Sequence, residues 1–193
     1  MSKILAIDPG TERSAWCELE DGKPIRWATQ LNADVLDMLR GRAWNWRPPQ
    51  YQLAIEGIAS YGMAVGREVF ETCMWIGRFR EAWENRHGVA QIVYRREVKL
   101  FHCENARAND ANIRAAIIDR FGPGKDVAIG RKASPGPLFG IKGDEWSALA
   151  IALTAAGLQT ASANRSQDVQ EGGQAGAGEL QRIGKPALPA GVD

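Results

Sequence analysis

Residues 4–11 of the chain read ILAIDPGT, a short apolar run that stops at Asp8 and a Pro-Gly turn. Such a run is typical of a buried strand that reaches an edge of its sheet, because Pro and Gly supply the backbone angles of the following turn. Residues 53–57 read LAIEG and repeat the pattern, with Glu56 after the apolar run. A third acid, Asp144, precedes the apolar helical stretch 147–153, so we expect it at a helix start.

Each of these acids also has an ordinary explanation. Asp8 fits a simple turn, Glu56 fits a solvated strand end, and Asp144 fits a helix N-cap. Three independent turns would rarely place acids at the ends of separate apolar elements, and converging carboxylates repel one another unless a cation lies between them. The pattern therefore predicts a metal site and favours a metal-dependent phosphodiester nuclease.

Together with the Ala-Leu-Ala triplet at 148–150, these residues resemble the RuvC-type Holliday junction resolvases of the RNase H-like superfamily. The resemblance covers residues 4–157 and points to the versions carried by bacteriophages and prophages. It implies an endodeoxyribonuclease that cleaves Holliday junctions or other branched DNA by two-metal hydrolysis. Asp8, Glu56 and Asp144 would be its catalytic ligands for two Mg²⁺ ions, with Mn²⁺ as the alternative metal.

The chain departs from the family pattern beside the third acid. Ser147 replaces the fourth metal-binding acid of the family, and Lys142 stands where family members often have His. On a helix Ser147 lies three residues from Asp144 and shares its face, so its hydroxyl can reach the same site. Glu145 is the other candidate for the fourth metal ligand.

Basic residues gather between residues 94 and 132, where nine Lys or Arg stand against five Asp or Glu. DNA phosphate is the expected partner, because Lys and Arg that neutralise phosphates supply affinity independent of base sequence. The alternative is a solvated charged surface, since the net charge of the chain is only +1.

The resemblance gives Lys99 a catalytic role. The family's second Lys falls at Asp110, so we expect Lys142 to serve the scissile phosphate instead. Tyr61 is placed to stack on an unpaired base, with ordinary packing as the alternative. The predicted DNA-binding residues are Tyr61, Arg67, Arg95, Arg96, Lys99, Arg107, Arg131, Lys132 and Lys142.

Hydrophobic periodicity predicts an α/β fold in which three antiparallel strands precede strands that alternate with helices. This is the order of an RNase H-like mixed five-stranded sheet flanked by helices. An Asp21-Gly22 turn is typical of the first hairpin. The expected strands cover residues 4–7, 14–20, 25–30, 52–55 and 89–94. The expected helices cover residues 33–40, 63–85, 110–121 and 144–156, with Gly157 as the last C-cap.

Two further segments need separate treatment: one has two possible interpretations, and the other is interpreted through the resemblance. The Gly- and Pro-rich connection 122–143 is either a mobile DNA-contacting loop or contains a short strand over residues 126–129. In the long helix, Val69, Cys73, Ile76 and Trp83 follow helical spacing. The resemblance implies a homodimer, paired partly through residues 63–83.

Composition sets the domain organisation. Residues 1–158 are expected to form one RuvC-like nuclease domain, and the low-complexity tail 159–193 is expected to be disordered. The chain has no run of 18 apolar residues and no signal peptide pattern, so we expect no membrane association and a cytoplasmic location. The three cysteines lack C-x-x-C spacing, which argues against a zinc site or a disulfide framework.

Two other functions compete with the nuclease. The stretch around Asp8 also resembles the first phosphate loop of actin-like ATPases and sugar kinases, but those enzymes need two such domains and this chain has one. A non-catalytic junction-binding protein, whose site decayed at Ser147, is the second alternative.

Overall fold

The computed structural model describes residues 3–42, 51–60, 62 and 64–179, with side chains as far as residue 162. Five strands form one sheet in the order β3-β2-β1-β4-β5. β1 pairs antiparallel with β2, and β2 antiparallel with β3, whereas β1 with β4 and β4 with β5 are parallel. This confirms the predicted mixed α/β sheet. The strands are β1 Lys3–Asp8, β2 Arg13–Glu20, β3 Lys23–Leu31, β4 Gln52–Gly57 and β5 Gln91–Tyr94.

The hairpin between β2 and β3 turns at the predicted pair. Asp21 and Gly22 have φ angles of 47° and 79°. A two-residue hairpin turn with positive φ at both positions matches the right-handed twist of the strands, which explains the Asp-Gly sequence.

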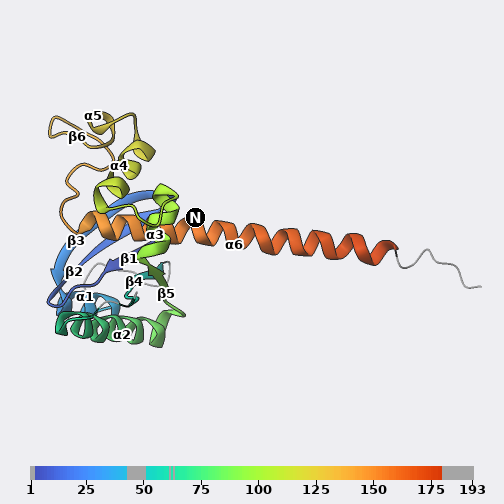
Figure 1. The fold of residues 1–193 in the computed structure, drawn as a ribbon, viewed down its shortest axis with the longest axis horizontal. Coiled ribbons are helices and arrows are strands. Elements are labelled where there is room, and N and C mark those ends of the chain that lie inside the picture. The colour runs from blue at the N-terminus through green and yellow to red at the C-terminus, as the bar shows by residue number, and fades with distance from the viewer. Residues whose placement is uncertain (1–2, 43–50, 61, 63, 180–193) are drawn as a thin grey trace, which may run out of the picture. The chain divides into compact units, whose positions relative to one another are not determined.

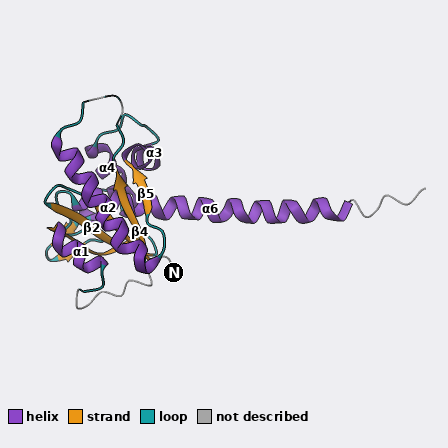
Figure 2. Ribbon diagram, turned by 90° about the horizontal axis from the view of Figure 1, so that it is seen from below, coloured by secondary structure: helices purple, strands orange, loops and turns teal. Residues whose placement is uncertain are grey.

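Helices cover both faces of the sheet (Figures 1 and 2). α1 (Asn32–Leu39) and α2 (Arg67–His87) pack on one face against a core that includes Leu5, Ile7 and Trp83. α3 (Arg95–Cys103), α4 (Asp110–Phe121) and the first turns of α6 (Glu145–Glu179) pack on the other. Because side chains alternate along a strand, the unbroken apolar run of β1 supplies both cores.

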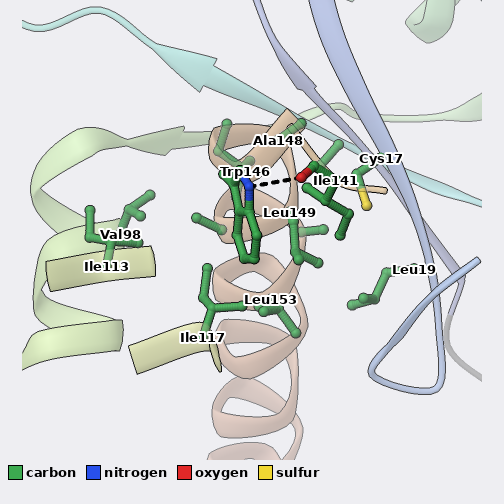
Figure 3. Packing of buried hydrophobic residues seen from close by; sticks show 14 of the residues in the cluster. Cys17, Leu19, Val98, Ile113, Ile117, Ile141, Trp146, Ala148, Leu149 and Leu153 are labelled. Carbon is green, nitrogen blue, oxygen red and sulfur yellow. Dashed lines mark hydrogen bonds between the residues drawn. The ribbon is translucent and has the colours of Figure 1, made fainter. Parts of the chain in front are cut away.

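The second core surrounds the start of α6. Trp146 is buried there and its indole N–H donates to the Ile141 carbonyl at 3.1 Å. Figure 3 shows this bond, with Val98 of α3 and Ile113 of α4 on the other side of the indole. The packing fixes where α6 begins, and with it the position of Asp144.

The helices differ from the prediction in three respects. α2 begins at Arg67, later than predicted, and Met63 lies outside the described residues. Cys73 of α2 is exposed, whereas Thr72 is buried, so the predicted face was partly wrong. α3 was not predicted, because its charged sequence hides a single buried residue, Val98.

Of the two alternatives for residues 122–143, the short strand over residues 126–129 is wrong. That segment forms the one-turn helix α5 (Lys125–Ala128). A small hairpin follows, with strands β6 (Gly130–Arg131) and β7 (Ser134–Pro135). The Gly130 φ of 69° begins the hairpin, and a Cβ there would lie 2.3 Å from the Ser134 carbonyl oxygen. A residue with a side chain would therefore not fit at this position of the hairpin.

Gly157 does not end the last helix, which corrects the predicted C-cap. α6 continues to Glu179. A Cβ on Gly157 would lie 2.2 Å from Cε2 of Phe101, so the glycine serves the close approach of α3 to α6. Inter-residue contacts divide the chain into the units Met1–Gly157 and Leu158–Asp193. Disorder of the tail stays a prediction, and among the described residues no helix has the length and hydropathy of a bilayer span.

Candidate active site

Asp8 and Glu56 lie side by side where two parallel strands end. Ile7 pairs with Ile55, so the next residue of each strand meets the other at the same edge. Ala6 and Ala54 pack in the core under α6. Because side chains alternate, Asp8 and Glu56 project to that same face. Asp144, just before α6, acts on Asp8 electrostatically, so the three acids share one neighbourhood.

The Asp8 carboxyl is in an environment that disfavours its charge. Its pKa is raised to about 8, first by burial and then by the negative charge of Glu56, a hydrogen bond with Glu56 and the charge of Asp144. The positive charge of Arg95 partly opposes it. Asp8 therefore keeps its proton at neutral pH unless another cation compensates the neighbouring acids.

Buried polar side chains hold the turn that follows Asp8. Asn32 Nδ2 donates to the Gly10 carbonyl at 2.9 Å, and Ser14 Oγ donates to Asn32 Oδ1 at 2.6 Å. The Gly10 N–H donates to Ser14 Oγ at 3.3 Å. Ser14 and Asn32 are each only 1% exposed. The sequence did not reveal this network, because its partners lie up to 22 residues apart.

Glu56 opens onto a cleft of about 290 Å³. Gly57 permits the tight packing behind it, since a Cβ there would lie 2.4 Å from Ile92 Cγ2. The cleft is lined by Pro9, Glu56, Gly57, Ile58, Ala59, Thr72 and Arg95.

Arg95 joins the acids to the basic segment. Its Nη1 lies 3.6 Å from Glu56 Oε1, and its Nη2 donates to Asp110 Oδ1. Glu56 Oε1 is buried and makes no hydrogen bond to the described residues, since its contact with Arg95 is too long to be one. As the first residue of α3, Arg95 is fixed by a helix start at which the Tyr94 N–H donates to Glu97 Oε2 at 2.7 Å.

The residues after Asp144 have different surroundings. Asp144 is exposed, and its carbonyl accepts from the Ala148 N–H at 3.1 Å. Glu145 is buried and accepts from the Lys142 N–H at 3.0 Å. Burial raises the pKa of the Cys17 thiol, and the charges of Glu18 and Glu145 add to this rise. Ser147 instead lines a small cleft with Arg95. These contacts favour Ser147 over Glu145 as a fourth ligand.

The predicted DNA-binding residues occupy several places. Arg95, Arg96 and Lys99 line a cleft of about 300 Å³ on α3. Arg67 is exposed and pairs with Glu71 at 2.6 Å. Tyr61 lies outside the described residues. The other basic residues, Arg107, Arg131, Lys132 and Lys142, are exposed, with Arg131 in β6 and Lys132 after it.

The donor set suits a hard cation, although the acids are not arranged around one. Among the described residues, no three His, Cys, Asp or Glu side chains are grouped to hold a metal ion. The acids nevertheless offer carboxylate oxygens, the ligands that Mg²⁺ prefers, and Glu56 Oε1 is a buried acceptor to which no described residue donates.

Solved structures of RuvC from Thermus thermophilus have a similar fold. One, in complex with a Holliday junction substrate, matches with a TM-score of 0.56 and 18% sequence identity, covering 81% of this chain and 93% of that chain. Another matches with a TM-score of 0.53 and 19% identity, covering 80% and 93%. Neither a model of a known protein family nor a curated protein matches the chain. The likeness at this identity shows a RuvC-like fold.

Proposed function

We propose that the chain is a metal-dependent endodeoxyribonuclease that cleaves Holliday junctions or other branched DNA. The observation that supports the proposal is the placement of Asp8 and Glu56 side by side at the ends of two parallel strands, with Asp144 close enough for its charge to act on Asp8. Asp8 and Glu56 are both partly buried, and a carboxyl pKa raised by burial and by neighbouring charges is typical of functional sites. The RuvC-like fold supports branched DNA as the substrate, since the similar protein was solved with a Holliday junction.

Asp8, Glu56 and Asp144 would hold two Mg²⁺ or Mn²⁺ ions, with Ser147 as the fourth ligand. Divalent ions bound in this way activate a water and stabilise the leaving oxygen of a phosphodiester. The protein itself contributes the position of the acids. The network of Ser14 and Asn32 holds the turn after Asp8, and the packing of Trp146 holds the start of α6.

DNA would reach the acids along α3. Lys99 is partly buried beside Arg96 in the α3 cleft, and Arg95 belongs to both this cleft and the Glu56 cleft. A phosphate in the α3 cleft would therefore lie beside the acid site. The exposed Arg107, Arg131 and Lys132 extend the basic surface, so binding should weaken as salt rises.

The proposed enzyme works as a homodimer through α2. Phe70 and Met74 are 60% and 62% exposed and lie four residues apart on one side of this helix. Exposed apolar side chains at this spacing suit a helix that packs on a second copy. Three expectations stay predictions: the cytoplasmic location, the relation to bacteriophage or prophage proteins, and the domain boundary at residue 158.

Cleavage of defined substrates tests the proposal. Labelled four-way junction, flap, duplex and RNA-DNA hybrid are incubated with the protein and Mg²⁺, beside Asp8→Asn and an EDTA control. Paired nicks in the junction that disappear in both controls are the expected result. Cutting of the hybrid alone would reassign the enzyme as a ribonuclease, and cutting that survives Asp8→Asn would refute the site.

A junction-binding protein without cleavage is the second candidate. Two observations favour it, namely Ser147 in place of an acid and the contact of Arg95 with Glu56. In that case the four-way junction binds tightly in Mg²⁺ and remains uncut. Gel-shift assays run beside the cleavage assay separate the two functions.

A further inference from the structure

Arg95 lies where three clefts meet. It lines the Glu56 cleft, the α3 cleft with Arg96 and Lys99, and the small cleft with Ser147. Its side chain is 28% exposed, so part of it is open to solvent. The guanidinium thus lies between the proposed metal site and the proposed phosphate path.

Two acids compete for this guanidinium. Glu56 faces Nη1 at 3.6 Å and its carboxylate is 16% exposed, whereas Asp110 receives the hydrogen bond from Nη2 and is 79% exposed. Asp110 is not needed to cap α4, because Asn109 does this by accepting from the Asn112 N–H at 3.0 Å. The Asp110 carboxylate is therefore available to hold Arg95 partly away from Glu56.

We propose that Arg95 is a resident counter-ion of the acid site, which a divalent cation must displace from Glu56 and which then turns to a DNA phosphate. Asp110 acts as its second anchor. A cation at Glu56 repels the guanidinium, and the α3 cleft, already basic, gives it an anionic partner only when DNA is bound. Metal binding and DNA binding are consequently coupled through one side chain. This inference rests on the proposed function, since it assumes that the acids take a divalent cation.

Calorimetry of Mg²⁺ binding to the protein without DNA tests the first half. Arg95→Gln removes the competing charge and should bind Mg²⁺ about tenfold more tightly. Asp110→Asn frees Arg95 to pair with Glu56 and should bind Mg²⁺ about threefold more weakly. Asp119→Asn removes an exposed acid from the same helix and controls for net charge, so its affinity should stay near that of the wild type.

The opposite signs of the two variants are the decisive result. The inference is overturned if Arg95→Gln and Asp110→Asn leave the Mg²⁺ affinity unchanged or shift it in the same direction. It is also overturned if neither the wild type nor the variants bind Mg²⁺. If the wild type cuts junctions while both variants bind Mg²⁺ normally, the proposed function stands and the role of Arg95 fails. If the opposite shifts occur but no DNA is cut, the counter-ion role stands and the nuclease fails.

Junction binding tests the second half. Ca²⁺ replaces Mg²⁺ to suppress cleavage, and junction affinity is measured with Ca²⁺ and with EDTA. The ratio of the junction affinity in Ca²⁺ to that in EDTA should be at least threefold larger for the wild type than for Arg95→Gln. Arg96→Gln, altered at the adjacent exposed position, should weaken binding by the same factor in both conditions. An equal Ca²⁺ effect in wild type and Arg95→Gln contradicts the coupling.

Discussion

The Asp8 carboxyl lies in a site that favours its neutral form. Its pKa in the folded protein is about 8, against an ordinary value of 3.8, so between these values the folded state holds a proton that the unfolded state has lost. In EDTA, the free energy of unfolding should therefore fall as pH rises from 5 to 8. Asp8→Asn should remove about 2 to 4 kcal/mol of this fall. Urea unfolding at pH 5 and pH 8 measures the free energy of unfolding of both proteins. An equal fall in Asp8→Asn and the wild type would contradict the prediction.

Asn32 is a second residue whose role follows from its contacts. Asn32→Ala leaves the Ser14 hydroxyl and the Gly10 carbonyl without their partner, which should cost about 1 to 3 kcal/mol of stability. Mg²⁺ affinity should fall as well, because the turn after Asp8 loosens. Asn85→Ala, which loses an exposed hydrogen bond to Glu81, is the control and should change stability by under about 0.5 kcal/mol. Equal effects of the two variants would refute the positioning role.

At the scale of elements, the crossing of α3 and α6 depends on a glycine inside a helix. Gly157→Ala improves helix propensity by about 1 kcal/mol, but its Cβ would overlap the Phe101 ring. We expect a net loss of about 1 to 2 kcal/mol, because overpacking outweighs propensity. Phe101→Leu should relieve the overlap, so a double-mutant cycle measured by urea unfolding should show strong coupling. Additive effects would mean that the helices do not approach this closely.

The elements were predictable to different degrees. α4 begins and ends where periodicity placed it, because its Asn109 cap and its buried Ile113 and Ile117 are local signals. α3 escaped prediction, since charged residues fill its first turns and Val98 is its single buried residue. The segment after Gly122 folds into α5 and a hairpin through backbone contacts that periodicity does not encode.

At the scale of the whole molecule, the proposed dimer predicts a mass. Sedimentation should give about twice the 21.1 kDa of one chain. Phe70→Glu places a charge in the α2 face and should yield a monomer, with loss of paired nicking. Val89→Glu is the matched control, because Val89 is 83% exposed outside that helix, and it should leave the mass unchanged. A wild-type monomer, or a dimer that survives Phe70→Glu, would exclude this interface.

The sequence by itself determined the order of the strands along the chain, the Asp21-Gly22 hairpin and the candidate acids Asp8, Glu56 and Asp144. These depend on apolar runs and turn residues that act over a few positions, so they are visible in the order of amino acids. Tertiary structure alone decided that Arg95 contacts Glu56 and Asp110, and that Asn32 holds the turn after Asp8. Such contacts join residues that are distant in the chain, and no local pattern specifies them because they arise only when the sheet and its helices pack together.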